Sequence, residues 1–247
     1  MNWLVAGKVE QFGRKIQPML LRLCGPRGPL SMLSPMAMAF VRARRKLTWE
    51  RLWNVERRRP VEHLSTALPA ELVEAVESGW IPAGSSIMDV GAGRGQISAW
   101  LAEHGFQVIG VDLSSEATRL ANEHFRHVSD RLEFRTLDVC SGTPEPARFD
   151  AFIDRGCYHG IPPPLKKQYV ANMAVWAKPG ARFLLLSKAD DDGRRVVSRV
   201  TAAFDPYFKV VRTEATVLTR STGPYPRTVR PGRVFWMVRR DADRRPG

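Results

Sequence analysis

The chain has few cysteines and no long apolar run, and both absences restrict what it can be. Its three cysteines, Cys24, Cys140 and Cys157, are widely separated, so they predict neither a disulfide framework nor a metal site. No run of eighteen apolar residues occurs, so no transmembrane helix is expected. Basic residues interrupt the first twenty positions, so no secretory signal is expected either. The prediction is a cytoplasmic protein that holds no metal.

Negative charge is scarce at both ends of the chain. Of the net charge of +13, residues 1–60 carry +10 and residues 227–247 carry +5, whereas residues 61–226 carry −2. An enzyme that acts on RNA would more often surround its active site with basic residues. The near-neutral central part therefore favours a small molecule over a nucleic acid as the partner.

A glycine turn between two apolar runs organises the centre of the chain. The order over Ser86–Asp112 is strand, glycines, helix, strand and acid, which is one half of a nucleotide-binding βαβ unit. Its parts are the strand Ile87–Val90, the glycines Gly91, Gly93 and Gly95, the helix Gln96–His104, the strand Gln107–Val111 and the acid Asp112. A tight turn of this kind needs positive φ or a bare Cα, and a ligand lying on it tolerates no Cβ. Asp112 ends the second strand, where a carboxylate can accept hydrogen bonds from both ribose hydroxyls.

The residues around these glycines discriminate between nucleotides. The third glycine of a dinucleotide fingerprint would stand at position 96, which is Gln96. Asp89 precedes the first glycine, and its carboxylate would repel a pyrophosphate but could bind an ammonium group. S-adenosylmethionine carries an ammonium and a sulfonium and no phosphate. We therefore expect S-adenosylmethionine as the cofactor and S-adenosylhomocysteine as its product.

Helices and strands alternate through the rest of the central part, which predicts an α/β, doubly wound and mostly parallel sheet. The expected helices are Pro69–Ser78, Ser114–His127, Pro162–Ala177 and Val196–Phe204, and the expected strands are Leu132–Val139, Phe149–Ile153, Arg182–Ser187, Phe208–Val217 and Arg233–Val238. Asp138 lies at the end of the strand Leu132–Val139, the heptapeptide Asp154–Gly160 follows the strand Phe149–Ile153, and ligands meet such strand ends.

These motifs resemble class I S-adenosylmethionine-dependent methyltransferases, and within them the thiopurine S-methyltransferase-like group of thiol, halide and tellurite methyltransferases. The group is suggested by Trp49 and Trp53 ahead of the glycines, by Asp-Arg-Gly at 154–156 and by Lys-Pro-Gly at 178–180. The resemblance implies a Rossmann-like sheet of seven strands with an antiparallel last strand, plus a helical N-terminal extension. The cofactor-binding residues that it implies are Trp49, Trp53, Asp89, Gly91, Ala92, Gly93, Gly95, Asp112, Leu113, Asp138, Val139 and Asp154.

The acceptor is expected at the heptapeptide after the fourth strand. His159 is the candidate general base, with Asp154 and Arg155 beside it; a histidine hydrogen-bonded in the helix start is the alternative. Tyr158 and Tyr225 are candidates to line the acceptor pocket, although each fits a core or rim position as well. The predicted reaction transfers a methyl group to an S, O or N nucleophile of a small apolar or aromatic acceptor. The alternatives are an RNA methyltransferase that uses its basic ends, and a cofactor-binding protein that transfers no methyl group.

The ends of the chain are predicted to be separate from the catalytic part. The expected division is a basic helical extension over residues 1–60, the cofactor-binding domain over 61–240 and a basic tail over 241–247. Residues 1–23 carry an apolar stripe at helical spacing with basic residues off it. Such a helix packs on its own domain or lies on an anionic membrane surface, and both interpretations remain open.

The membrane interpretation predicts that vesicles containing anionic lipid sediment the full chain, because basic and apolar side chains would bind together at the lipid surface. A chain that starts near Arg45 should stay in the supernatant. Equal behaviour of the two chains in the sedimentation assay would rule out a membrane role for the N-terminal stripe.

Overall fold

The computed structural model describes residues 35–57, 68–125, 127–128, 130–141, 148–190, 193–220 and 228–240. The apolar stripe over 1–23, Tyr225 and the tail over 241–247 lie outside the described residues. Contacts divide the chain into two compact units, Met1–Arg45 and Lys46–Gly247. The larger unit therefore begins at Lys46, and it includes Trp49 and Trp53, which the sequence had placed in the N-terminal extension.

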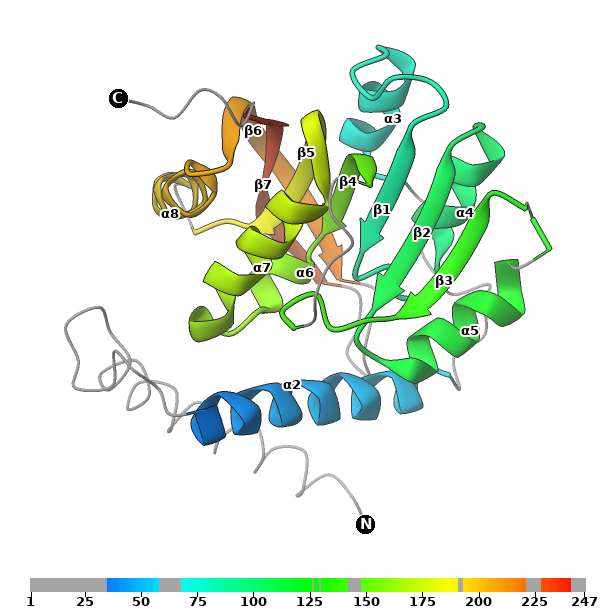
Figure 1. Ribbon diagram of the computed structural model, residues 1–247, viewed down its shortest axis with the longest axis vertical. Coiled ribbons are helices and arrows are strands. Elements are labelled where there is room, and N and C mark those ends of the chain that lie inside the picture. The colour runs from blue at the N-terminus through cyan, green and yellow to red at the C-terminus, as the bar shows by residue number, and fades with distance from the viewer. Residues whose placement is uncertain are drawn as a thin grey trace. The chain divides into compact units, whose positions relative to one another are not determined.

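A seven-stranded sheet forms the centre of the larger unit (Figure 1). Its strand order is β3-β2-β1-β4-β5-β7-β6. The first five strands in this order pair in parallel, and β7 is antiparallel to both of its neighbours. The strands are β1 Ser86–Val90, β2 Gln107–Asp112, β3 Leu132–Thr136, β4 Phe149–Arg155, β5 Ala177–Lys188, β6 Phe208–Arg220 and β7 Thr228–Arg239. The expected doubly wound sheet with an antiparallel last strand is thus confirmed.

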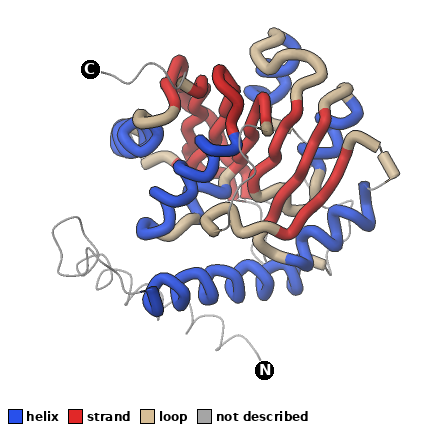
Figure 2. Tube along the Cα trace, viewed as in Figure 1, coloured by secondary structure: helices blue, strands red, loops and turns tan. Residues whose placement is uncertain are grey.

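Helices connect the parallel strands, as Figure 2 shows by its alternation of helix and strand. The helices are α2 Pro35–Glu56, α3 Ala70–Glu77, α4 Gln96–Glu103, α5 Ser115–Phe125, α6 Cys157–Gly160, α7 Pro163–Trp176 and α8 Arg194–Phe204. None of the helices in the described ranges is long and apolar enough to cross a membrane.

Alternate residues of the central strands pack into two different cores. On one face, Ile153 of β4 and Leu184 of β5 join a cluster that includes Leu72 of α3 and Leu101 of α4. On the other face, the aromatic side chains of neighbouring strands and helices contact one another. They are Phe152, Tyr158, Tyr169, Phe183, Phe204 and Phe208. Burial of each such side chain stabilises the fold by about 1.5–3 kcal/mol, so both faces fix the sheet.

The predicted third strand is longer than the observed one. It was expected to reach Val139, but β3 ends at Thr136. The backbone N–H of Leu137 donates to the carbonyl of Asp112, and the Asp138 carboxylate then accepts the N–H of Cys140 at 2.9 Å. This side-chain turn ends the strand and leaves Asp138 at the same sheet edge as Asp112.

Candidate active site

The glycine turn lies at the carboxyl end of β1, where the ends of β2 and β4 also meet. Gly91, Gly93 and Gly95 all have positive φ, at 77°, 58° and 87°. The N–H of Gly91 donates to Val111 at 2.8 Å, which ties the turn to β2. Because L residues with side chains rarely adopt such φ values, three of them within five positions require glycine.

Neighbouring side chains also occupy the space that larger residues would need. A Cβ at Gly91 would lie 2.8 Å from Cβ of Cys157, and one at Gly93 would lie 3.0 Å from the Trp53 ring. A Cβ at Gly95 would overlap the ring of Phe134 on β3. The turn is therefore a bare backbone surface enclosed by α2, β3 and α6.

Asp112 stands at one side of this turn. Its Oδ2 accepts the N–H of Gly93 at 3.1 Å, and its Oδ1 accepts the N–H of Ser114 at 2.9 Å. The carboxylate is thereby oriented at the tip of β2, as the sequence predicted.

Asp89 stands at the other side and is only 2% exposed. Burial raises the pKa of this carboxyl from 3.8 to about 7, and the charges of Asp154 and Asp112 raise it further, while a hydrogen bond from Ser98 opposes the shift. The Ser98 hydroxyl donates to Oδ2 of Asp89 at 2.6 Å. A buried carboxyl whose pKa is near 7 binds a cation strongly, because the nearby positive charge stabilises the ionised carboxylate.

Trp49 and Trp53 lie beside the glycine turn. Trp53 is 4% exposed and packs with Trp49 against Ala117 and Leu120 of α5. Trp49 also lies near α6, because a Cβ at Gly160 would be 3.4 Å from its ring. The indole nitrogen of Trp53 is buried and has no hydrogen-bond partner among the described residues. A donor in this state is unusual in a folded protein and is a position where a bound molecule can accept a hydrogen bond.

Asp154 is fully buried at the end of β4. Its carboxylate accepts the N–H of Cys157 at 2.7 Å, the N–H of Tyr158 at 2.9 Å and the hydroxyl of Tyr169 at 2.6 Å. Burial raises its pKa to about 6, although these hydrogen bonds lower it. Among the described contacts of Asp154, none joins it to His159, so its observed role is to hold the start of α6 in place.

His159 is half-buried on α6, and its Nδ1 lies 3.4 Å from the backbone N–H of Lys188. Burial lowers the pKa of this imidazole to about 4, and the nearby Lys188 and Lys166 lower it further. With Nδ1 accepting, the proton of the neutral ring is on Nε2. His159 in this arrangement is a hydrogen-bond donor and a weak base.

Arg155 is the last residue of β4, and its side chain is on the same face of the sheet as Asp89. Burial lowers the pKa of its guanidinium, while the charges of Asp89 and Glu71 raise it. Its side chain therefore lies in the field of the buried carboxyl beside the glycine turn. This places Arg155 near the cofactor side of the site.

Tyr158 takes the core position that the sequence had left open beside a place in the acceptor pocket. It was a candidate for the acceptor pocket, but it is 4% exposed and its ring packs 5.4 Å from Tyr169 and 5.3 Å from Phe204. The structure places it in the aromatic core, because α6 turns its second residue toward the sheet. Tyr225 lies outside the described residues.

The remaining predicted cofactor residues surround the turn. Ala92 donates its N–H to Val111 at 3.0 Å. Leu113 and Val139 are buried beside Asp112 and Asp138 in the sequence. The carbonyl of Val139 accepts the side-chain N–H of Asn172 at 3.0 Å, which ties this strand end to α7.

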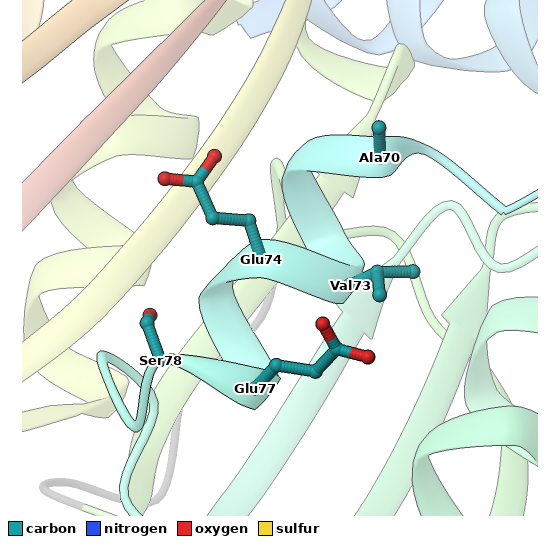
Figure 3. Close-up of a pocket in the computed structure, with 5 residues that line it drawn as sticks. All are labelled: Ala70, Val73, Glu74, Glu77 and Ser78. Atoms are coloured by element: carbon teal, nitrogen blue, oxygen red, sulfur yellow. The ribbon is translucent and has the colours of Figure 1, made fainter.

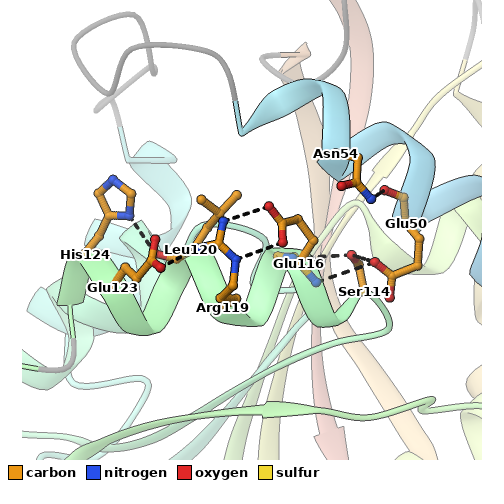
Figure 4. A network of polar contacts seen from close by, with 9 residues as sticks. Glu50, Asn54, Ser114, Glu116, Arg119, Leu120, Glu123 and His124 are labelled. Carbon is orange, nitrogen blue, oxygen red and sulfur yellow. Dashed lines mark hydrogen bonds and ion pairs between the residues drawn. The ribbon is translucent and has the colours of Figure 1, made fainter.

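Sequence reasoning did not single out Ser98 or Glu50, and it considered Ser114 only as a cap of the following helix, although each contacts a predicted site residue or its helix. Figure 4 shows Glu50 of α2 beside Ser114 at the start of α5. Glu50 stands between the two tryptophans in the sequence, and this position was a signal that could have identified it.

A surface hollow elsewhere on the molecule does not belong to this site. Figure 3 shows it on α3, lined by Ala70, Val73, Glu74, Glu77 and Ser78. All five side chains come from one helix and its end. None of the predicted site residues borders the hollow, so it has no part in the cofactor site.

The residues present fit S-adenosylmethionine. The glycine turn offers a surface that a Cβ would fill, Trp53 offers a buried donor without a partner, and Asp89 and Asp112 offer carboxylates on either side. Among the described residues, no group of histidine, cysteine and acidic side chains could hold a metal ion.

Comparisons with known proteins agree with this geometry. The family model described as a methyltransferase domain matches residues 87–180. A protein-L-isoaspartate O-methyltransferase of Brucella anthropi is 31% identical over 111 residues, which make up 44% of this chain and 48% of that protein. A ubiquinone biosynthesis O-methyltransferase of Coxiella burnetii is 30% identical over 100 residues, or 40% of this chain and 42% of that protein. The alignments thus span about half the length of these curated relatives or less.

A solved structure extends the likeness of fold. The 1,6-didemethyltoxoflavin N1-methyltransferase of Burkholderia thailandensis, with S-adenosylhomocysteine bound, has a TM-score of 0.61 at 20% identity, covering 85% of this chain and 92% of that one. The matched family is the general methyltransferase domain, so membership of the thiopurine S-methyltransferase-like group stays a prediction. Residues 87–180, which match the methyltransferase-domain model, include Asp89, the three glycines and Asp112, and the sheet around them has the fold of this methyltransferase structure.

Proposed function

We propose that this protein transfers the methyl group of S-adenosylmethionine to an S, O or N nucleophile of a small apolar or aromatic acceptor. The observation that carries the proposal is the bare glycine turn between two carboxylates at the carboxyl edge of a parallel sheet. In open α/β sheets, ligands bind in crevices at this carboxyl edge of the strands. Asp89, beside the first glycine, does not suit the pyrophosphate of a phosphorylated coenzyme.

Each side chain at the turn has a separate role toward the cofactor. Asp112 accepts hydrogen bonds from the ribose hydroxyls, and Asp138, at the end of the neighbouring strand, accepts one from the adenine amino group. Asp89 binds the ammonium group, and the buried N–H of Trp53 donates to an oxygen of the ligand. Bound S-adenosylmethionine supplies an electrophilic methyl group, and the chain supplies its orientation.

The protein's own contribution to the rate is alignment and the exclusion of water. In-line displacement needs the nucleophile, the methyl carbon and the sulfur in one line, and such positioning lowers barriers by up to about 7–11 kcal/mol. Trp49 and Trp53 lie over the turn and α6, where they shield the cofactor from solvent. Their ring faces also suit the positive sulfonium.

The acceptor binds next to α6. His159 lies on this helix, and Arg155 is the last residue of β4. His159 donates a hydrogen bond through Nε2 to the acceptor rather than acting as a strong base. An acceptor whose nucleophile is a thiolate, or is readily deprotonated, needs no more help than this. The thiol acceptors of the thiopurine S-methyltransferase-like group fit this site, while the O- and N-methyltransferases among the similar proteins support a wider choice of atom.

A screen with labelled S-adenosylmethionine tests the proposal. Purified protein is incubated with panels of thiols, phenols and heteroaromatic compounds, and with bulk tRNA, and label transfer is followed by chromatography. We expect transfer to one of the small-molecule classes. Tight binding of S-adenosylhomocysteine with no transfer to any acceptor would instead support a binding protein, and transfer to tRNA alone would support an RNA methyltransferase.

Gly93→Ala should weaken S-adenosylhomocysteine binding at least about tenfold by calorimetry, because the added Cβ fills the turn and displaces the Trp53 ring 3.0 Å away. Gly84→Ala is the matched control, since Gly84 also has positive φ (71°) but has nothing within 4 Å of an added Cβ. Both variants should lose unfolding free energy through strain at positive φ, and Gly93→Ala should lose more because its Cβ also displaces the buried Trp53 ring. Equal ligand affinities in the two variants would show that the turn does not bind the cofactor.

Asp89→Asn should weaken S-adenosylhomocysteine binding at pH 8 and abolish its pH dependence. In the wild type, affinity should fall by roughly tenfold from pH 8 to pH 6, because Asp89 with a pKa of about 7 becomes protonated and loses its attraction for the ammonium group. A wild-type affinity that stays constant between pH 6 and pH 8 would contradict this role.

The same variant changes ligand-free stability in a defined direction. The folded pKa of Asp89 lies above its usual value of 3.8, so its ionisation destabilises the folded state, and this effect declines as pH falls from about 7 toward 3.8. Asp89→Asn should therefore melt at a higher temperature than the wild type at pH 8, with a smaller difference at pH 5. A pH-independent difference in melting temperature would be inconsistent with a buried, titrating Asp89.

A further inference from the structure

Glu50 connects α2 to the start of α5 through several hydrogen bonds. Its Oε1 accepts the N–H of Ser115 at 2.8 Å and the Ser115 hydroxyl at 3.0 Å, and its Oε2 accepts the Ser114 hydroxyl at 2.7 Å (Figure 4). The N–H of Glu116 lies 3.5 Å from the same Oε2. A side chain far away in the sequence thus satisfies the first free N–H groups of α5, which normally need a capping residue or water.

The charge of Glu50 suits this position. The N-terminus of a helix carries a partial positive charge, so a carboxylate there is stabilised. Although burial raises the pKa of Glu50, the hydrogen bonds from Ser114 and Ser115 lower it overall. Glu50 is therefore ionised at neutral pH, and its contact with α5 involves a full negative charge.

Ser114 links Glu50 to the cofactor carboxylate. Its backbone N–H donates to Oδ1 of Asp112 at 2.9 Å, while its hydroxyl donates to Glu50. Ser114 also caps α5 itself, because its Oγ accepts the N–H of Ala117 at 3.3 Å. The Ser114 side chain is completely buried, whereas Glu50 is only partly buried. One serine thus couples the orientation of Asp112 to the position of α2.

Glu50 also lies between the two tryptophans that cover the turn. Trp49 precedes it directly, and Trp53 stands three positions later on the same helix. The rings pack on Ala117 and Leu120, one and two turns further along the helix that Glu50 caps. Packing alone permits α2 to slide along α5, whereas the hydrogen bonds of Glu50 define one register.

We propose that Glu50 is a positioning residue that fixes Trp49 and Trp53 over the glycine turn by binding the start of α5. This inference rests on the proposed function, since the turn is taken as the cofactor site. Glu50 does not touch the cofactor in this account. It acts through the two tryptophans and through Ser114.

The experiment compares Glu50→Ala and Glu50→Gln with Glu116→Gln in the full chain. Glu116 is the matched control, because it also places a carboxylate in the first turn of α5 but pairs with Arg119 of its own helix at 2.8 Å. Two quantities are measured: hydrogen exchange of the segment 49–55 without ligand, and the dissociation constant of S-adenosylhomocysteine. Melting temperatures establish that each variant is folded.

We expect Glu50→Ala to speed exchange over 49–55 and to weaken S-adenosylhomocysteine binding by about tenfold or more, since several charge-assisted bonds are lost. Glu50→Gln retains one acceptor oxygen and should fall between Glu50→Ala and the wild type. Glu116→Gln should match the wild type in both measurements. This ranking of the variants distinguishes a positioning role of Glu50 from a general effect on the stability of α5. A general effect would appear in the Glu116 variant as well.

The possible outcomes test the role of Glu50 separately from the proposed function. Unchanged exchange and affinity in Glu50→Ala, or equal changes in Glu116→Gln, would overturn the role of Glu50. If Glu50→Ala fails to fold, the comparison of Glu50→Gln with Glu116→Gln decides the question in the same way. A wild type that binds no S-adenosylhomocysteine would contradict the proposed function, while the exchange data would still test whether Glu50 fixes α2.

Discussion

The backbone of three glycines with positive φ determines how the site is built. It lets the chain reverse directly after β1, and so leaves a backbone surface at the edge of the sheet, against which Cys157, Trp53 and Phe134 pack. Asp89 reaches this surface from inside β1, and Asp112 reaches it from the end of β2. The tryptophans of α2 close it from outside.

The buried carboxyl groups of the site destabilise the folded state, and other interactions in the fold must offset this free-energy cost. Asp89 and Asp154 are both buried, and each has a pKa raised toward neutrality by its loss of water. Asp154 recovers part of this cost through the bonds from Tyr169 and the start of α6, whereas Asp89 accepts a hydrogen bond from the Ser98 hydroxyl. A buried charged group with few hydrogen bonds is common at a ligand site, because the bound ligand supplies the missing hydrogen bonds or the opposite charge.

Sequence reasoning succeeded where the pattern is local. Glycine spacing, the apolar run before it and the acid after β2 specify a turn that needs no distant partner, so the turn and the order of elements were predicted well. The prediction was weaker for Tyr158 and for the length of β3. Burial of Tyr158 depends on how α6 faces Tyr169 and Phe204, and the end of β3 depends on a bond between Leu137 and Asp112. Such contacts join residues that lie far apart in the sequence, and no periodicity reveals them.

Phe134 has a consequence that extends beyond the site itself. Its ring occupies the space that a Cβ would need both at Gly95 and at Gly110, where the approach would be 2.6 Å. One aromatic side chain on β3 therefore constrains two glycines on different elements. During divergence, a larger residue at Gly110, which does not have positive φ, becomes acceptable only after position 134 has become smaller. Evolutionary change at these two positions should then be ordered in time, whereas Gly95 stays fixed by its backbone whatever residue stands opposite.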